Sequence, residues 1–153
     1  MSGDCLRTLD EQRVVLDVAF ALTGESMLLA PFAESVEMLS MRTGERLASL
    51  NHGGATATSV TLSPCGLTAL TLADDGVIRA WSAVTGECVL ALEADAMVRS
   101  VCFATCEGEV AIATGSEGGD LRMWSLSSGR LLREARSHAG AIRALVCIPE
   151  VTL

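Results

Sequence analysis

The sequence repeats itself with a spacing of 41 to 44 residues, and this period limits the fold more than any other feature. A fixed period in this range is typical of chains that stack one small supersecondary unit several times. The sequence therefore predicts a tandem array of similar units. Three sets of residues keep the spacing: Val18, Val60, Val101 and Leu145; Gly24, Gly66 and Gly108; and Gly44, Gly86 and Gly129.

One unit is clearest over residues 73–92, which read ADDGVIRAWSAVTGECVLAL. It contains two alternating apolar runs, each preceded by a turn, at residues 74–76 and 85–86. Alternation of this kind predicts β-strands, and Asp and Gly tolerate the backbone geometry of tight hairpin turns. Related stretches occur at residues 34–50 and 118–132. Helical spacing is not sustained anywhere, so the predicted fold class is all-β.

The segments DDGVIRAW, ending at Trp81, and TGSEGGDLRMW, ending at Trp124, resemble the WD40-repeat family of β-propellers, whose blades have four strands and repeat every 40 to 45 residues. The resemblance implies a single partial propeller domain, residues 1–153, with about three four-stranded antiparallel blades. We expect full blades over residues 14–50, 56–92 and 97–135, the outer strand of an incomplete blade over residues 1–10, and the inner first strand of another over residues 141–149.

Family members typically close a ring of about seven blades. Three copies and two fragments do not complete such a ring. We therefore expect the chain to be a fragment or a truncated form of a longer propeller protein, or to need a partner or self-assembly to complete the ring. Open blade faces are an aggregation hazard, so we expect the polypeptide alone to be partly aggregated or dependent on a partner.

The resemblance also implies a buried hydrogen-bond network in the middle blade, made by His52, Thr71, Asp75 and Trp81. A buried Trp has one N–H group to satisfy, and a hydroxyl can accept it. The hydroxyl can donate to an imidazole, which can donate onward to a carboxylate. A complete network of this kind makes a blade rigid.

Thr, His and Asp together also invite a catalytic interpretation, but the family gives these residues a structural role, so no catalytic residue is expected. His52 and His138 lack the neighbouring Cys or carboxylate pattern of a metal site. The glycines Gly115, Gly118 and Gly119 lie in a turn between strands, whereas a phosphate-binding loop precedes a helix. The sequence therefore predicts no metal and no cofactor.

In this family, partners mostly bind at the narrow face around the channel, at residues entering the first strand and at the residue before the turn Asp. Carried over to this chain, these positions include Asp74, Met97, Arg99, Glu117 and Arg143. Arginines flanked by exposed apolar residues are typical of binding hot spots. We expect this patch to receive an acidic or phosphorylated segment of a protein partner.

Composition bears on partners and compartment. The net charge of −8 disfavours direct binding to the phosphate backbone of nucleic acids. No apolar run reaches the roughly 18 residues of a membrane helix, and residues 1–13 lack the apolar centre of a signal peptide. Six scattered cysteines without CxxC pairs are most simply reduced thiols. We expect a soluble intracellular protein, in the cytoplasm or the nucleus, that does not contact membranes.

The resemblance to WD40 proteins implies a non-enzymatic scaffold that mediates protein–protein contacts. An alternative is a piece of a subunit of a ribonucleoprotein or ribosome-processing complex, as in transducin-β-like proteins. A propeller enzyme is a third alternative, and it would need polar or metal-binding residues at the channel. The inner strands DVAFA, SVTLS and SVCFA offer few such residues.

Overall fold

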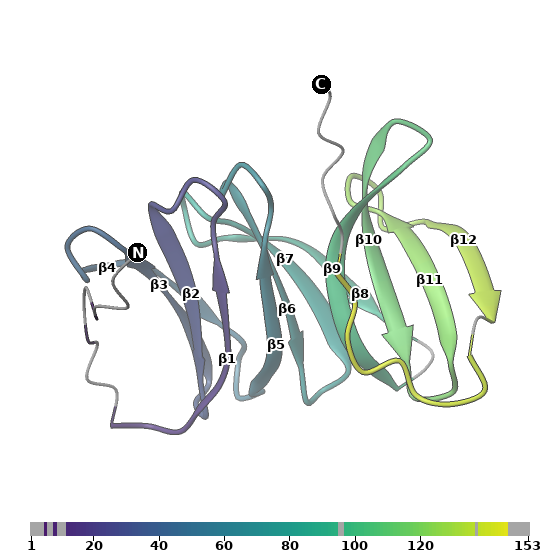
Figure 1. The fold of residues 1–153 in the computed structure, drawn as a ribbon, viewed down its shortest axis with the longest axis horizontal. Coiled ribbons are helices and arrows are strands. Elements are labelled where there is room, and N and C mark those ends of the chain that lie inside the picture. Colours follow the sequence, from purple (N-terminus) through teal and green to yellow (C-terminus); the bar gives the residue numbers. More distant parts are fainter. Residues whose placement is uncertain (1–4, 6–7, 9–11, 95–96, 137, 147–153) are drawn as a thin grey trace.

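The protein folds into three small antiparallel sheets that stand side by side (Figure 1). The computed structural model describes residues 5, 8, 12–94, 97–136 and 138–146. Within these residues every helix-or-strand element is a strand. The strands are β1 (Val15–Phe20), β2 (Ser26–Pro31), β3 (Ser35–Ser40) and β4 (Arg46–Asn51) in the first sheet; β5 (Ala57–Leu62), β6 (Thr68–Ala73), β7 (Val77–Ser82) and β8 (Cys88–Glu93) in the second; and β9 (Val98–Cys106), β10 (Glu109–Ser116), β11 (Asp120–Ser125) and β12 (Leu131–Arg136) in the third.

Each sheet is a simple meander in which every strand pairs with its neighbours in the sequence. All pairings are antiparallel. The predicted all-β class and the three four-stranded antiparallel sheets are thus confirmed. The sheets span residues 15–51, 57–93 and 98–136, and each strand meets the next through a short turn.

The turn between the third and fourth strands is built in the same way in every sheet. In the second sheet, the amide of Gly86 donates to the carbonyl of Ser82 at 2.8 Å, and the amide of Thr85 donates to the Ser82 hydroxyl at 3.2 Å. Gly86 has a φ of 75°, a conformation that favours glycine. The same bonds recur at Ser40, Thr43 and Gly44, and at Ser125, Ser128 and Gly129.

Every sheet also carries two β-bulges at matching places. One lies where the first strand begins to pair with the second, so one residue of the first strand has no opposite residue. The other lies on the fourth strand, opposite the position of Trp81. A bulge bends its strand and re-aims the extra side chain. The extra residues are Leu16, Thr58 and Arg99 on the first strands, and Leu47, Val89 and Leu132 on the fourth strands.

The sheets pack face to face through two hydrophobic cores. One core lies between the first and second sheets and includes Leu28, Leu50 and Trp81. The other lies between the second and third sheets and includes Leu70 and Ile112. Full burial of such a side chain contributes about 1.5–3 kcal/mol. The second sheet is therefore buried on both faces, which explains its nearly continuous apolar strand β6.

The two predicted terminal strands have different outcomes. The outer strand expected over residues 1–10 lies almost entirely outside the described residues, and Cys5 and Thr8 are not in a strand. The inner strand expected over residues 141–149 is wrong for residues 141–146, which form no strand. A strand needs a neighbour that supplies a ladder of hydrogen bonds, whereas this segment bonds at isolated points, such as the amide of Ile142 to the carbonyl of Ser116 at 2.9 Å.

The described residues include no helix that could cross a membrane. None of the five described cysteines is joined in a disulfide.

Candidate functional site

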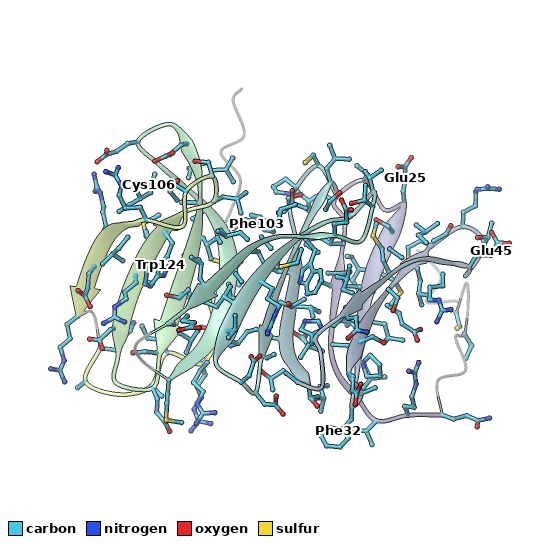
Figure 2. All side chains as sticks on the ribbon, turned by 180° about the vertical axis from the view of Figure 1, so that it is seen from behind. Glu25, Phe32, Glu45, Phe103, Cys106 and Trp124 are labelled. Carbon is cyan, nitrogen blue, oxygen red and sulfur yellow. The ribbon has the colours of Figure 1, made fainter. Side chains whose placement is uncertain are left out.

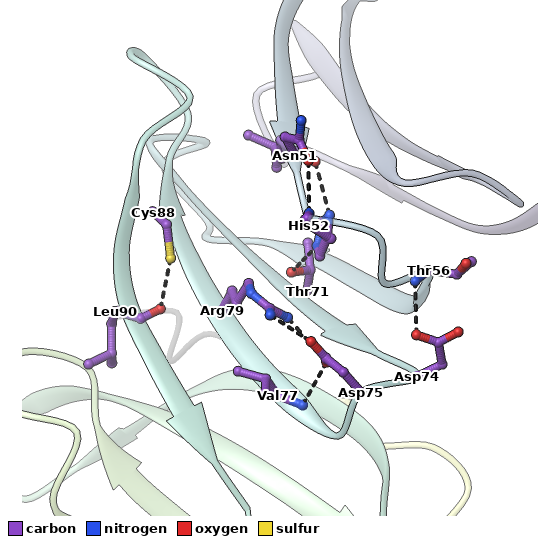
Figure 3. A network of polar contacts seen from close by, with 12 residues as sticks. Asn51, His52, Thr56, Thr71, Asp74, Asp75, Val77, Arg79, Cys88 and Leu90 are labelled. Atoms are coloured by element: carbon purple, nitrogen blue, oxygen red, sulfur yellow. Dashed lines mark hydrogen bonds and ion pairs between the residues drawn. The ribbon is translucent and has the colours of Figure 1, made fainter.

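A buried hydrogen-bond chain crosses the boundary between the first and second sheets (Figure 3). The indole nitrogen of Trp81 donates to the Thr71 hydroxyl oxygen at 2.9 Å. That oxygen lies 2.8 Å from Nε2 of His52, and Nδ1 of His52 lies 2.9 Å from the carbonyl oxygen of Leu50. The structure thus brings together three of the four residues that the sequence predicts for this network.

The Leu50 carbonyl, at which this series of hydrogen bonds ends, sets the direction of each bond. A carbonyl only accepts, so Nδ1 of His52 carries a proton and donates it to Leu50. Nε2 of the neutral ring then accepts from the Thr71 hydroxyl, which itself accepts from Trp81. Burial lowers the pKa of His52, the main effect, while its hydrogen bond to the Leu50 carbonyl acts in the opposite direction. The network is complete when the imidazole is neutral.

Asp75 is not part of this chain, which corrects the prediction. Its carboxylate binds the guanidinium group of Arg79, with Oδ2 at 2.6 Å from Nη2 and Oδ1 at 3.2 Å from Nη1. Oδ1 also accepts from the amide of Val77 at 3.0 Å. A two-pronged bond to a cation is stronger than a bond to a neutral ring, and the hydrogen bond to Arg79 lowers the pKa of Asp75. His52 turns to the Leu50 carbonyl instead.

The other two sheets carry reduced versions of the network. In the third sheet, the indole of Trp124 donates to the Thr114 hydroxyl at 3.1 Å, and that hydroxyl donates to the carbonyl of Arg122 at 3.4 Å. In the first sheet the matching positions are Leu29 and Leu39, which belong to a small apolar cluster. Among the described residues, a histidine therefore joins only the Thr–Trp pair of the middle sheet, and it links that sheet to the segment that follows β4.

The side chains of this network are buried, which suits a structural role better than a reactive one. Thr71 has no exposed surface and His52 is 5% exposed. A hydroxyl without access to solvent cannot approach a substrate, and both of its hydrogen-bond directions are already used. Burial with full satisfaction makes the group a rigid internal cross-link.

Four predicted binding residues lie along one edge of the second and third sheets, where the first strand begins and the second strand turns into the third: Asp74, Met97, Arg99 and Glu117. Phe32, at the same edge, is seen at the bottom of Figure 2. One backbone bond repeats along the edge: the amides of Phe32, Asp74 and Glu117 donate to the carbonyls of Val14, Thr56 and Met97, at 2.7, 2.9 and 2.8 Å. The first-strand bulges at Leu16, Thr58 and Arg99 lie beside these bonds. We call this surface the strand-entry edge.

Two of the predicted binding residues are paired with each other. Nη2 of Arg99 lies 3.0 Å from Oε2 of Glu117, and the two side chains are 48% and 50% exposed. Asp74 is held differently, since its carboxylate accepts from the amide of Thr56 at 2.9 Å. Met97 is 62% exposed. Arg99 and Glu117 were predicted from the sequence as separate contact positions, whereas in the structure they form one ion pair.

Arg143 lies close to this pair along the backbone. Its neighbour in the sequence, Ile142, accepts a hydrogen bond through its carbonyl from the Ser100 hydroxyl at 3.4 Å. Ser100 in turn follows Arg99. The backbones that carry Arg99 and Arg143 therefore meet, and Arg143 is exposed.

The sequence interpretation missed a carboxylate at the boundary between the first two sheets. Asp17 in β1 accepts from the amide of Val18 at 2.9 Å and from the amide of Val60 in β5 at 2.8 Å. It thus bonds two first strands that no ladder joins. The only signal in the sequence is that Asp17 stands where the other units have Ser59 and Ser100.

Comparison with known proteins adds evidence on the fold alone. No protein-family model and no curated protein matches this chain. Among solved structures, the chain is similar to the crystal structure of the computationally designed Ika4 protein, with a TM-score of 0.75 and 19% sequence identity. The likeness covers 97% of this chain and 88% of that chain.

Proposed function

We propose that this chain is a WD40-type segment of a β-propeller that acts as a non-enzymatic scaffold and binds a protein partner at the strand-entry edge. The three sheets would be three blades. Their regular meander order, their repeated bulges and the bonding of Thr71 to Trp81 support the proposal, as does the same Thr–Trp bond in the third sheet.

The observation that carries the proposal is the first-strand bulge, which recurs at one place in all three sheets. It adds one side chain from each sheet to the same edge: Leu16, Thr58 and Arg99. Bulges are over-represented next to functional sites, where they re-aim side chains. The edge also exposes large apolar groups, with Phe32 at 68% and Met97 at 62%, and arginine beside exposed apolar residues is typical of binding hot spots.

The partner that fits best is an acidic or phosphorylated peptide segment. The guanidinium of Arg99 has five N–H donors, and its ion pair with Glu117 engages Nη2. A phosphoryl group would compete with the Glu117 carboxylate for Arg99 and could reach Arg143 from the same side. Both side chains of the existing pair are about half exposed, so the pair costs little to open.

The test uses arrayed peptides in three matched forms, with serine, phosphoserine or glutamate at one position, and fluorescence polarisation to measure affinity. We expect the phosphorylated form to bind most tightly. Arg99→Glu should weaken that binding at least tenfold, which corresponds to about 1.4 kcal/mol. Glu117→Gln should strengthen it because the variant removes the competing carboxylate.

Arg46→Glu is the matched control. Arg46 is an arginine with a 62% exposed side chain that also contacts a glutamate, Glu37, but it begins β4, away from the strand-entry edge. This variant should leave peptide affinity unchanged. Equal affinity of all three peptide forms, or equal loss in Arg46→Glu and Arg99→Glu, would refute the proposal.

A further inference from the structure

The two boundaries between sheets use the same residue positions. At the first boundary, the second sheet contributes the face that carries Val60, Leu62 and Trp81. At the second boundary, the third sheet contributes Val101, Phe103 and Trp124 from the same positions. We call this face of each sheet the Trp face. The first sheet has no tryptophan on this face, and its matching residues are Val18, Phe20 and Leu39.

The partner of a Trp face is in both cases the other face of the preceding sheet. The first sheet offers Leu28, Ala30 and Val36 from this side, and the second sheet offers Leu70, Leu72 and Ile78. We call this the reverse face. The matching positions in the third sheet are Ala113, Gly115 and Leu121.

The Trp face of the first sheet is open to solvent at its first strand, whereas Leu39 on the same face is already buried, at 8% exposed. Val18 is 43% exposed and Phe20 is 56% exposed, whereas the matching residues at the two boundaries are buried: Val60, Val101, Leu62 and Phe103 are at most 8% exposed. Exposed apolar groups in contiguous patches mark interaction sites. The pattern of this patch is that of the boundaries, so the occupant it fits is a reverse face of the same repeat.

The reverse face of the third sheet is covered at one point by the chain itself. Ile142 is only 6% exposed and lies over Gly115, where an added Cβ atom would come within 2.8 Å of the Ile142 Cβ atom. The amide of Ile142 donates to the carbonyl of Ser116, and its carbonyl accepts from the Ser100 hydroxyl. Ala57 and Val98 begin the first strands β5 and β9 at the internal boundaries. Ile142 is the matching residue of the next repeat, because it precedes Leu145 by three residues, as Ala57 precedes Val60.

We propose that two copies of this chain associate head to tail, with the Trp face of the first sheet in one copy packed on the reverse face of the third sheet in the other, and that Ile142 over Gly115 opposes this association. In the docked arrangement, Val15 at the start of β1 would take the place that Ile142 occupies. The interface is heterologous, so the same contact can form repeatedly and give closed rings or open chains. The proposal is independent of peptide binding at the strand-entry edge.

The test measures the mass of the full chain by sedimentation velocity across a wide range of concentration. Gly115→Ala should strengthen association at least tenfold, because the new methyl group displaces Ile142. Alanine fits the sheet at this position, since Ala30 occupies it in the first sheet and is fully buried at the boundary. Ile142→Ser should act in the same direction by weakening the contact from the other side.

Phe20→Glu should abolish association in the native chain and in both strengthened variants. Val84→Glu is the control, because Val84 is 74% exposed but lies in the turn between β7 and β8, away from both faces. Near-ultraviolet circular dichroism of Trp81 and Trp124 checks that each variant is folded. A chain that stays monomeric even as Gly115→Ala, or association that survives Phe20→Glu, would overturn the proposal. Equal association of the native chain and both Ile142-releasing variants would overturn the role of Ile142.

Discussion

The Nε2 atom of His52 lies 2.8 Å from the hydroxyl oxygen of Thr71, and this contact joins the segment leaving the first sheet to the centre of the second. The ring of His52 also lies 5.0 Å from the ring of Trp81, centroid to centroid. Asp17 bonds the same two sheets at their first strands, through the amide of Val60. Two polar cross-links therefore accompany the apolar core at this boundary.

Thr71→Val should destabilise the protein more than Thr114→Val. Valine has the shape of threonine without its hydroxyl. At position 71 the change leaves both the Trp81 N–H and the His52 Nε2 without partners, whereas at position 114 it leaves the Trp124 N–H. Each buried unsatisfied group costs about 1–3 kcal/mol, so we expect losses of about 2–6 kcal/mol for Thr71→Val and about 1–3 kcal/mol for Thr114→Val. Urea denaturation followed by tryptophan fluorescence measures both, and equal losses would contradict the cross-link.

The stability of the protein should fall in mildly acidic solution because of His52. Burial holds the pKa of this imidazole below its usual value of about 6.5, so the unfolded chain takes up the proton first. The stabilisation is therefore fully present above about pH 6.5 and is lost as the pH falls from there through the lower pKa of the folded state. Denaturant titrations between pH 7.5 and 5 measure this loss.

His52→Gln is the matched variant for the pH experiment. A glutamine amide does not titrate, and it can accept from Thr71. It does not reproduce the shape of the imidazole or its second bond, to the Leu50 carbonyl, so this variant should be less stable at pH 7.5 by about 1–2 kcal/mol. The difference between the native chain and the variant should shrink as the pH falls. His138 is present in both chains and cancels in the comparison. A difference that stays constant with pH would show that His52 is not the titrating group.

Asp75→Asn should have a small effect. The ion pair with Arg79 is partly exposed, at 31% for Asp75 and 17% for Arg79, and such pairs contribute about 0–1 kcal/mol. Asparagine can still accept from the amide of Val77. We expect a loss below about 1 kcal/mol, less than that of Thr71→Val. A loss as large as that of Thr71→Val, measured in the same denaturation assay, would instead place Asp75 in the network.

Glu107→Asn should stabilise the β9–β10 hairpin, which extends beyond the other turns in Figure 1. Glu107 has a φ of 53° and is followed by Gly108 at 86°, and Asn-Gly is the preferred pair for such a two-residue turn. The change removes an exposed ion pair with Arg133, which contributes little. We expect a gain of about 0.5–1 kcal/mol.

Thermal denaturation measures this gain, and Glu109→Asn is its control. Glu109 begins β10, where asparagine has no advantage and is disfavoured as a strand residue. This second variant should leave the melting temperature unchanged or lower it. A higher melting temperature for Glu109→Asn than for Glu107→Asn would argue against turn strain.

The periodic spacing was sufficient to predict three similar units, because the period sets the size of each unit and the glycines locate its turns. The four strands of each unit followed from the resemblance to WD40 repeats. Gly44, Gly86 and Gly129 are read directly from the sequence, and the structure gives them positive φ values. The bonding of Thr71 with Trp81 also follows from local chemistry, since a buried indole needs an acceptor ten residues away on the paired strand. Properties fixed by one unit alone were thus accessible.

Contacts that depend on competition between side chains could not be predicted from the sequence. Asp75 had two candidate partners, and only the positions of the guanidinium and imidazole groups decide in favour of Arg79. Arg99 and Glu117 are eighteen residues apart, so their pairing needs the register of β9 with β10. The segment around Ile142 has the composition of a first strand but forms none, because strand formation depends on a neighbouring ladder rather than on composition.

The first-strand bulges make some surface side chains independent of the packing between the sheets. Leu16, Thr58 and Arg99 lie within strands, yet each stands outside the ladder that alternates the remaining side chains between the two cores. Replacing any of them leaves that alternation intact. The side chains at these three positions can therefore change, in evolution or by design, as freely as those of surface loops, while the stacked cores stay the same.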